Sequence, residues 1–314
     1  MLLSPESARH LPDPTEPGPG GLADVPADWP AVWEALLAVR HGRPAPALAF
    51  QPDTGWRLAQ PVDARCQALF DLYRPLLDAR SRAHETPWVV AQMGQSLDGF
   101  VATATGDSYY VNGAHSLVHL HRLRALCDAV LVGAGTVAID NPQLTTRRVS
   151  GPHPVRVLLD PEARLDGQAR ALHDGQAPTL WVCDARHAES ARARWRSAAA
   201  PGAAATAEVV PVPGLLGDRG TCALPRALQA LAARGLRVLF VEGGGVTVSR
   251  FFAAGLLQRL HLSVAPVLVG EGRRGLRVPP HAVMADCPRP PARMVVLGDD
   301  VLWDLDLAAG AAGG

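Results

Sequence analysis

The segment from Asp128 to Arg147 constrains the fold of this chain more than any other. Its apolar, β-branched residues 129–132 predict a buried strand, and Gly133 and Gly135 follow that strand directly. The segment then becomes polar, with Asp140, Asn141, Pro142, Thr145, Thr146 and Arg147. A buried strand that ends in glycines, hydroxyl groups and arginines predicts a floor for an anionic ligand.

Strand and helix patterns alternate from Pro87 onward. Apolar runs predict strands at 88–93, 129–132, 155–159, 179–182, 208–212 and 236–241. Helices are expected at 114–126, 189–200 and 246–254, and from Leu224 to a stop at Gly235. Two longer strand patterns, 261–269 and 294–307, close the chain. Repeated β-α-β order with a final pair of adjacent strands predicts an α/β fold with a mostly parallel sheet, helices on both faces and an antiparallel edge.

The first 85 residues precede this alternating pattern. Residues 1–30 predict a disordered leader, because six prolines fall between residues 11 and 30. Residues 31–85 predict a small appendage: a helix capped by Asp28, two short extended pieces around 52–55, and a helix over 62–79. The appendage carries no recognisable chemistry, so we interpret it as a packing or dimer-contact module. Residues 86–307 form the main predicted domain, and 308–314 a disordered tail.

Composition narrows the class of protein. The chain has 314 residues, 48% of them hydrophobic, and no formal net charge, which disfavours nucleic-acid and anionic-membrane partners. Its five scattered cysteines form no C-x-x-C pair, a pattern typical of reduced thiols rather than a disulfide framework or a zinc site. The N-terminus lacks a signal-peptide pattern and no apolar run approaches the ~20 residues of a membrane span. We therefore expect a cytoplasmic protein.

The glycines after residues 129–132 invite comparison with a Rossmann fingerprint. Gly133, Gly135 and Ala138 fit G-x-G-x-x-A, and Asp160 ends the next predicted strand. The fingerprint needs a helix that starts at the glycines, and Pro142 leaves no room for one. We expect a phosphate-contacting loop instead, with a tight strand-exit turn as the alternative.

A second glycine run follows the strand at 236–241. Glu242 precedes Gly243, Gly244 and Gly245, and a helix is expected next. The free N–H groups of that helix's first turn attract a pyrophosphate, and glycines let it approach closely. Glu242 is then a candidate proton donor or ligand anchor, while a flexible turn is the alternative. Ligands of open α/β sheets bind at the carboxyl ends of strands, so the two glycine runs support each other.

Other charged residues give weaker patterns. Arg124, Arg147 and Arg148 are candidates for binding a phosphate, although single arginines usually lie on a solvated face. The helix at 114–126 should turn Leu117, Leu120 and Leu123 inward, which leaves its histidines on the polar face. His115, His119 and His121 lack a clear third ligand, and His187-Ala-Glu189 lacks the cysteine pair of a zinc deaminase, so no metal is expected.

A set of short motifs resembles a known family across residues 87–306. The chain is similar to the reductase domain of riboflavin biosynthesis, which has a dihydrofolate-reductase-like fold. The matching pieces, in the family's order, are Ser96-Leu-Asp98-Gly99, Val111-Asn112-Gly113, His121-Arg-Leu-Arg124-Ala, Asp128 to Val137, Asp140-Asn-Pro142-x-Leu144-Thr-x-Arg147, Val157-Leu-Leu-Asp160, Val241-Glu242-Gly243-Gly244 and Ala265-Pro-x-Leu-x-Gly270.

The resemblance implies a pyrimidine reductase that is a homodimer. Its reaction would be NADPH-dependent reduction of the ribosyl group of 5-amino-6-(5-phosphoribosylamino)uracil to a ribityl group, which needs alignment and a proton source but no protein nucleophile. Glu242 and Gln92 are the candidate catalytic residues. The residues expected at the substrate are Asn112, Arg124, Leu144 and Arg147. Those expected at the cofactor are Ala91, Gly135, Thr136, Asp140, Asp160, Gly243 and Gly244, with Arg164 a further candidate for the 2′-phosphate.

The chain departs from the family in two respects. Gln92 occupies a position where the family often has a lysine, and glutamine supplies neither charge nor proton. The deaminase domain that often precedes this reductase has no counterpart in residues 1–85, so we expect a stand-alone reductase. Both departures leave open a different pteridine-like or carbonyl substrate, or a non-catalytic nucleotide-binding role.

Overall fold

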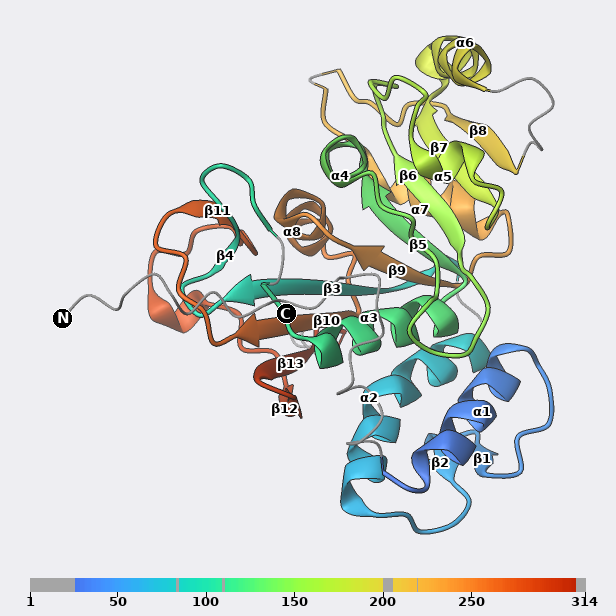
Figure 1. Ribbon diagram of the computed structural model, residues 1–314, viewed down its shortest axis with the longest axis vertical. Helices are drawn as coiled ribbons and strands as arrows, with labels where there is room; N and C mark the ends of the chain where they lie inside the picture. The colour runs from blue at the N-terminus through green and yellow to red at the C-terminus, as the bar shows by residue number, and fades with distance from the viewer. Residues whose placement is uncertain (1–25, 83–84, 109–110, 200–205, 219, 309–314) are drawn as a thin grey trace, which may run out of the picture.

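The computed structural model describes residues 26–82, 85–108, 111–199, 206–218 and 220–308 (Figure 1). The N-terminal elements are α1 (Trp29–Arg40), β1 (Leu48–Gln51), β2 (Gly55–Leu58) and α2 (Ala64–Ser81). The first half of the main sheet region comprises β3 (Trp88–Ser96), β4 (Phe100–Thr103), α3 (Ala114–Leu126), β5 (Ala129–Gly133), α4 (Ala134–Asp140), β6 (Val155–Leu159), α5 (Arg170–His173) and β7 (Thr179–Asp184). The second half comprises α6 (Ala188–Ala198), β8 (Ala207–Val212), α7 (Leu224–Ala232), β9 (Val238–Glu242), α8 (Gly245–Ala253), β10 (Arg259–Ala265), β11 (Gly272–Arg274), β12 (Ala292–Leu297) and β13 (Asp300–Asp306).

Nine strands form the central sheet, in the order β12-β13-β10-β3-β9-β5-β6-β7-β8. Every neighbouring pair from β10 to β8 is parallel, and β13 and β12 add an antiparallel edge. The predicted α/β class and mostly parallel sheet are therefore confirmed. Both long strands predicted at the end of the chain were wrong in extent: residues 294–307 are two strands that turn at Gly298, and the strand predicted at 261–269 ends at Ala265.

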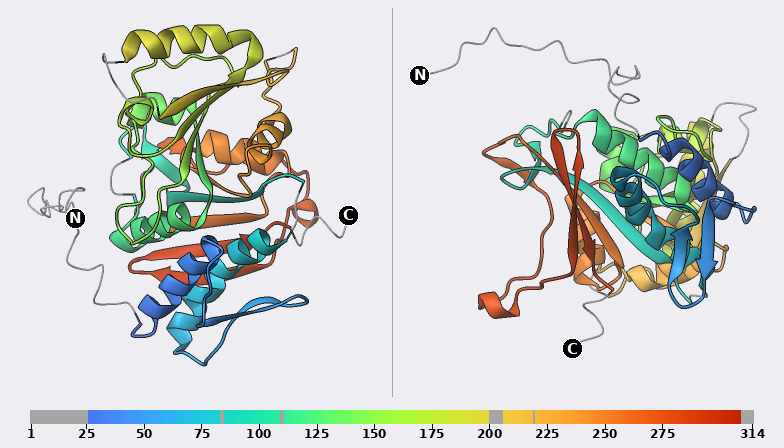
Figure 2. Two further views of the ribbon diagram at one scale, coloured as in Figure 1. Left: turned by 90° about the vertical axis from the view of Figure 1, so that its right-hand side faces the viewer. Right: turned by 90° about the horizontal axis from the view of Figure 1, so that it is seen from below.

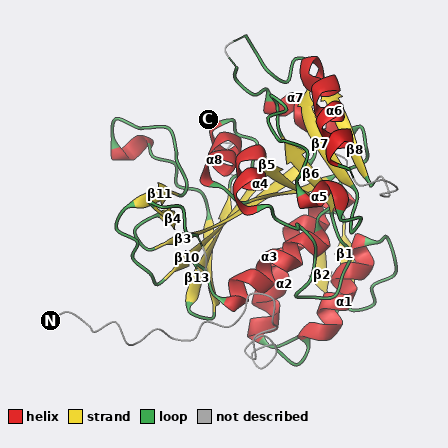
Figure 3. Ribbon diagram, turned by 45° about the horizontal axis from the view of Figure 1, so that its top comes forward, coloured by secondary structure: helices red, strands yellow, loops and turns green. Residues whose placement is uncertain are grey.

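Helices cover both faces of the sheet (Figure 3). Side chains alternate along each strand, so Val90 and Phe240 join the core under α1, α2 and α3, whereas Ala91 and Val241 join the core under α7 and α8. This alternation explains why the strands are apolar almost throughout. It also decides which strand residues can face a ligand that binds beside α3.

The inner side of α3 is more polar than its leucines predict. Leu123 is fully buried as expected, but Leu117 is 36% exposed. The buried positions include Ser116, His119 and His121 instead. The expectation that α3 turns Leu117 inward and its histidines outward is therefore wrong for these residues, because α3 lies over polar residues of β10 such as His261, which His119 contacts.

A short helix does start at the first glycine run. The seven-residue α4 begins at Ala134 and ends where Asn141 takes a left-handed conformation, with φ +39°. The expectation that Pro142 leaves no room for a helix is wrong, because two turns fit before the proline. The long segment 141–154 then carries the chain back to β6, the parallel neighbour of β5.

The N-terminal helices pack directly on the sheet domain. In the turned views of Figure 2, the blue helices α1 and α2 lie against α3, and Trp29, Trp33 and Tyr73 contact one another beneath them. Their buried residues belong to the same core cluster as those of the sheet. The helix α1 starts at Trp29, inside the predicted leader, whereas residues 1–25 of that leader and 309–314 of the predicted tail lie outside the described residues.

Two further sequence expectations concern the ends of these helices. Asp63 caps α2 through the amide groups of Arg65 and Cys66, whereas Asp28 precedes α1 without a side-chain capping bond. The division of the chain into an appendage and a main domain stays a prediction. None of the described helices combines the length and the apolar character needed to cross a bilayer.

A chain of buried hydrogen bonds joins the helix α2 to strand β13, on the α3 face of the sheet. The Tyr73 hydroxyl lies 2.8 Å from His119 Nδ1, and His119 Nε2 lies 3.0 Å from His261 Nδ1. His261 Nε2 then lies 3.4 Å from Asp304 Oδ1. Because an ionised carboxylate only accepts, the donors run from Tyr73 towards Asp304, with one proton on each imidazole. Burial lowers the pKa of His119 well below its usual value, which is consistent with that arrangement.

Candidate functional site

A cavity of about 800 Å³ opens at the carboxyl ends of β3, β5 and β9. Its walls come from α3, α4, α8 and the small β4–β11 sheet, which the sequence did not predict. Nine of the predicted site residues line it: Gln92, Asn112, Gly135, Thr136, Asp140, Arg164, Glu242, Gly243 and Gly244. Five do not: Ala91, Arg124, Leu144, Arg147 and Asp160. Both glycine runs therefore meet at one cavity, at the end of the sheet where α/β proteins bind ligands.

The two glycine runs pack against each other. A Cβ atom built on Gly133 would lie 2.5 Å from Thr247 Oγ1, and one built on Gly244 would lie 2.9 Å from Thr136 Oγ1. Each run therefore needs a glycine to accommodate a threonine of the other. At Gly135, by contrast, nothing lies within 4 Å of a built Cβ. Its missing side chain leaves backbone open to a ligand rather than relieving an internal contact.

The start of α8 offers free backbone donors to this cavity. The helix begins at Gly245, and the preceding Gly244 has no side chain with which to cap the first turn. Gly243 has φ +87°, a conformation that strongly favours glycine. First-turn N–H groups and the positive end of the helix dipole favour an anion at such a position.

Five arginines line the same cavity, and the sequence pointed to only one of them, Arg164. The others are Arg250, Arg273, Arg274 and Arg277. Arg273, Arg274 and Arg277 lie close together in the sequence RRGLR. This cluster is the feature of the sequence that could have indicated an anion-binding wall. Arg274 lies over the Phe100 ring, with 5.3 Å between its guanidinium carbon and the ring centroid. The cavity therefore matches a ligand that carries several negative charges.

Glu242 and Arg124 form a close ion pair under α3. Arg124 donates from Nε and Nη2 to the two carboxylate oxygens, at 2.8 Å and 2.6 Å, and its Nη1 donates to the Thr145 carbonyl at 2.8 Å. The side chains are 6% and 13% exposed. Such a bidentate pair is strong and directional. Arg124 is therefore engaged with protein groups, and Glu242 is the member of the pair that reaches the cavity.

The loop after α4 carries Leu144 and Arg147. Leu144 is fully buried with φ +58°, whereas Arg147 is exposed. Arg147 donates from Nη1 to Thr145 Oγ1 at 2.8 Å, and its backbone N–H donates to His121 Nδ1 at 2.9 Å. Burial, with the nearby charges of Arg124 and Arg147, lowers the pKa of His121 to about 3. His121 thus stays a neutral acceptor that anchors the loop.

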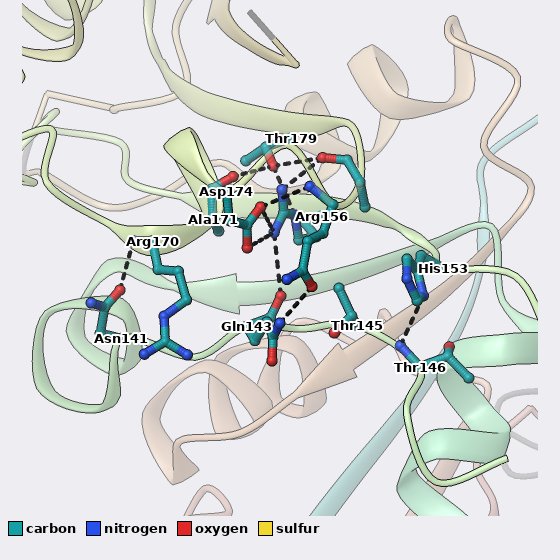
Figure 4. A network of polar contacts seen from close by, with 12 residues as sticks. Asn141, Gln143, Thr145, Thr146, His153, Arg156, Arg170, Ala171, Asp174 and Thr179 are labelled. Atoms are coloured by element: carbon teal, nitrogen blue, oxygen red, sulfur yellow. Dashed lines mark hydrogen bonds and ion pairs between the residues drawn. The ribbon is translucent and has the colours of Figure 1, made fainter. Parts of the chain in front are cut away.

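Arg156 holds the same loop from the other side (Figure 4). This fully buried residue of β6 donates to Asp174, to the Ala177 carbonyl and to Thr179, at 2.7–2.8 Å. It also reaches the Gln143 carbonyl at 3.4 Å. A single arginine inside the apolar run VRVLL is the weak signal in the sequence for this role.

Asp160 and Ala91 serve the scaffold. Asp160 is 1% exposed and accepts hydrogen bonds from the amide groups of Arg164 and Leu165 and from Trp181 Nε1, so it shapes the turn that carries Arg164. The Arg164 side chain itself is 75% exposed and pairs with Glu162 at 3.0 Å. Ala91 is fully buried on the opposite face of the sheet, under α7 and α8.

Gln92 lies between two polar neighbours on the α3 face of the sheet. It pairs in register with Glu242 of β9 and with His261 of β10. The residue is 6% exposed, and its buried Oε1 has no hydrogen-bond partner among the described residues. A buried polar atom without a partner is uncommon and costly, which suits a residue that completes its hydrogen bonds with a ligand.

His119 and His121 of α3 are structural in this arrangement. His119 and His121 each bond to protein groups, as described above, and the described residues contain no group of three or more His, Cys, Asp or Glu side chains suited to a metal ion. The site therefore offers backbone donors, arginines, the carboxylates of Asp140 and Glu242, and two amide side chains. These groups suit binding and alignment of an anionic ligand.

The region of the chain that carries the cavity also matches known proteins. Residues 87–283 match the family described as the RibD C-terminal domain. Over 206 residues the chain is 34% identical to the riboflavin biosynthesis protein RibD of Bacillus amyloliquefaciens, covering 62% of this chain and 52% of that protein. Over 188 residues it is 35% identical to the 2,5-diamino-6-ribosylamino-4(3H)-pyrimidinone 5′-phosphate reductase of Methanothermobacter thermautotrophicus, covering 59% of this chain and 80% of that protein.

Solved structures share the fold. RibD of Acinetobacter baumannii superposes with a TM-score of 0.59 at 23% identity, covering 77% of this chain and 63% of that one. The riboflavin biosynthesis reductase Rib7 of Saccharomyces superposes with a TM-score of 0.56 at 18% identity, covering 76% and 98%. The chain spans about half the length of the RibD relatives that it matches in sequence.

Proposed function

The chain belongs to the RibD C-terminal domain family, and we propose from this membership that it is an NADPH-dependent reductase of the riboflavin-pathway type. Its reaction would reduce the ribosyl group of 5-amino-6-(5-phosphoribosylamino)uracil to a ribityl group. The related 2,5-diamino-pyrimidinone phosphate is a second candidate substrate, because it is the compound in the name of the Methanothermobacter reductase. This chain covers 80% of that protein.

One observation carries the proposal. The two glycine runs, the start of α8 and five arginines surround a single cavity beside Glu242 and Gln92. A volume of about 800 Å³ lies at the upper end of the usual range for ligand sites, so a dinucleotide and a small substrate can share it. The pairing of a phosphate-binding wall with a small polar wall is what hydride transfer between two bound ligands requires.

A nicotinamide cofactor follows from membership of a reductase family, and the residues present fit one. The open backbone at Gly135 and the start of α8 would hold its pyrophosphate, with Thr136 and the cavity arginines nearby. When bound, such a cofactor supplies the hydride. The arginines favour the extra phosphate of NADPH over NADH, and Arg164 and Arg277 are the candidates for that contact.

The α3 side of the cavity would hold the pyrimidine. A carboxylate that accepts two hydrogen bonds from one guanidinium has no proton to give, so we assign Glu242 as an acceptor and ligand anchor. Gln92 would contribute its unpartnered carbonyl oxygen and its amide donors. Arg124 then positions Glu242, and the exposed Arg147 remains the candidate ligand for the substrate phosphate.

The test is consumption of NADPH in the presence of each pyrimidine phosphate, followed by absorbance. We expect turnover of at least one of them and a lower rate with NADH. Arg147→Ala should raise the substrate KM about tenfold or more, because a charged contact with the substrate phosphate is lost. Tight NADPH binding with no consumption of either pyrimidine would exclude the assigned substrates. A panel of pteridine-like and carbonyl compounds would then separate a different reductase from a nucleotide-binding protein.

We further propose that the protein is a homodimer whose contact includes the β12–β13 hairpin. Met294, Val296 and Trp303 are 61%, 64% and 41% exposed, and Met294 pairs with Trp303 across the two strands. Exposed apolar side chains on an edge hairpin favour contact with another chain. Sedimentation should give a dimer for the native chain and a monomer for Trp303→Glu, whereas a native monomer would exclude this contact.

A further inference from the structure

Asp300 lies outside residues 87–283, which match the family, yet it bonds to Asn112, which lines the cavity. It is 2% exposed at the start of β13. Its Oδ2 accepts three hydrogen bonds, from the Gly113 amide at 2.9 Å, Ser116 Oγ at 2.6 Å and Asn112 Nδ2 at 3.2 Å. A carboxylate at the N-terminus of α3 is favoured by the helix dipole. It binds the amide of the N-cap residue Gly113, whose own missing side chain leaves the first turn without a side-chain cap.

The contact with Asp300 fixes the orientation of the Asn112 amide. Asn112 Nδ2 lies between Asp300 Oδ2 and the Ser263 carbonyl, 3.5 Å away. Both groups only accept hydrogen bonds, so rotating the amide would set Oδ1 against two acceptors. Nδ2 therefore faces Asp300, and Oδ1 is left for another partner.

That oxygen lies over Gly94 at the cavity wall. A Cβ atom built on Gly94 would be 1.5 Å from Asn112 Oδ1, so only glycine leaves room for this side chain. Gly94 and Asn112 both line the cavity, on the same face of β3 as Gln92. The side-chain carbonyl of Asn112 is thus held beside a position where a ligand binds.

A second hydrogen bond stiffens the support. Ser116 donates its one hydroxyl proton to Asp300, so Ser263 Oγ donates to Ser116 Oγ at 2.7 Å. Ser116 and Ser263 are 1% and 0% exposed. Buried groups whose donors and acceptors are all matched hold one arrangement.

We propose that Asp300 is a positioning residue that acts through Asn112. It holds the Asn112 carbonyl as a hydrogen-bond acceptor for an N–H or O–H group of the pyrimidine substrate. The proposal rests on the proposed reductase function. It assigns a role in substrate recognition to the hairpin β12–β13, which follows the family region in the chain.

The experiment compares Asp300→Asn with the native enzyme at saturating NADPH. The variant keeps the shape of the side chain but places an amide where a carboxylate accepted three bonds. We expect the KM for the pyrimidine to rise about tenfold, the loss expected for one charge-assisted bond, with the NADPH KM unchanged. Asp299→Asn, at the exposed neighbouring position, should leave both constants unchanged.

A double-mutant cycle with Asn112→Ala separates positioning from general stability. If Asp300 acts through Asn112, then Asp300→Asn changes the pyrimidine KM little once Asn112 is alanine. Ser263→Ala removes a bond of the same network but keeps the Asp300–Asn112 contact. It should lower the free energy of unfolding and raise the pyrimidine KM much less than Asp300→Asn does. Equal effects of Asp300→Asn in both backgrounds would overturn the proposal.

Failure of the proposed reductase function would be seen in a different measurement from failure of the Asp300 proposal. If the native enzyme turns over neither pyrimidine, the proposed function fails, and the cycle is then measured on the free energy of unfolding. Zero coupling between Asp300 and Asn112 would refute the positioning contact itself. If Asp300→Asn does not fold, Gly94→Ala displaces Asn112 Oδ1 while sparing Asp300, and an unchanged pyrimidine KM in that variant would count against the proposal.

Discussion

The two walls of the cavity differ in how far their polar groups are already engaged. On the α3 wall, Glu242 is paired with Arg124 and Asn112 is bonded to Asp300. On the glycine wall, Gly135 faces open space, and Arg273 and Arg277 form no ion pair within the described part of the chain. Most of the α3 wall is therefore held in place before a ligand arrives, although Gln92 Oε1 there has no partner, whereas the glycine wall keeps these two arginines and open backbone for a ligand.

The difference fits two kinds of ligand contact. Groups held by other protein groups keep their geometry, which favours alignment of a reacting centre. Free arginines and backbone donors favour tight binding of phosphates, because the ligand brings the charge that they lack. The α3 wall should therefore govern stability and turnover together, and the glycine wall should govern cofactor affinity.

The largest effect is expected from Arg124→Ala. The change leaves Glu242 largely buried without its partner, which typically costs about 3–5 kcal/mol of unfolding free energy. Turnover should fall at least about 100-fold, since Glu242 loses its fixed position. Urea unfolding and steady-state kinetics measure both. Arg164→Ala is the matched control for stability, because the Arg164 side chain is 75% exposed. If both variants were equally stable, the Arg124–Glu242 ion pair would not hold the α3 wall in place.

The pH dependence of stability should also come from the α3 wall. The pKa of His121 is lowered to about 3 in the folded protein, below the value of about 6.5 expected when unfolded. Only the unfolded chain gains that proton as the pH falls below about 6.5, so the contribution of His121 to stability is constant above pH 7 and decreases towards pH 3. At pH 5 the loss should be about 2 kcal/mol.

Measuring the free energy of unfolding of the native chain and of His121→Asn at pH 7 and pH 5 tests whether His121 causes this loss of stability. The variant cannot titrate at that position, so its stability should fall less between pH 7 and pH 5. His119, whose pKa is also lowered by burial, should supply part of the remaining dependence. An identical decrease in the two proteins would show that His121 is not the group responsible.

Two glycine substitutions distinguish packing from ligand binding on the glycine wall. Gly133→Ala places a Cβ 2.5 Å from Thr247 Oγ1 and should cost about 1–2 kcal/mol of stability. Gly135→Ala meets nothing within 4 Å and lies in α4, so stability should hold or rise by up to about 1 kcal/mol. The NADPH Kd of Gly135→Ala should nevertheless increase about tenfold, because the new methyl group occupies ligand space. An unchanged Kd would place the cofactor elsewhere.

The smallest expected effect is a change of substrate preference in Gln92→Lys. Lysine only donates, whereas the buried Gln92 Oε1 is an acceptor without a partner. The uracil substrate has a carbonyl where the diaminopyrimidinone has an amino group, so lysine should shift the ratio of kcat/KM towards the uracil by about three- to tenfold. Competition between the two substrates measures that ratio. If kcat/KM changed equally for both substrates, Gln92 would not distinguish the carbonyl from the amino group.

The general architecture and the position of the site could be read from local patterns. Apolar runs of strand length, helix stops such as Gly235, and glycines at two strand ends act over a few residues, so they survive in the sequence. They predicted the α/β class and the two glycine runs that meet at the cavity. The short helix α4 could not be read from Pro142, because a proline ends a helix without excluding two turns before it.

Pairings between distant residues could not be read in this way. Strand β9 lies between β3 and β5, although residues 97–237 separate β3 from β9 in the chain. This order brings Glu242 to Arg124 and leaves Gln92 beside it. Periodicity shows which side of a strand is buried, but it carries no information on which strand comes next to it.

The tertiary structure therefore decided which charges are engaged and which are free. Asp300 bonds to Asn112 across 188 positions of sequence, and the arginines in and after β11 reach the cavity because β11 pairs with β4. In the sequence, Arg124 and Arg273 are equal cations. Folding neutralises one with Glu242 and leaves the other at the cavity, because only the packed sheet sets the distances over which charges and hydrogen bonds act.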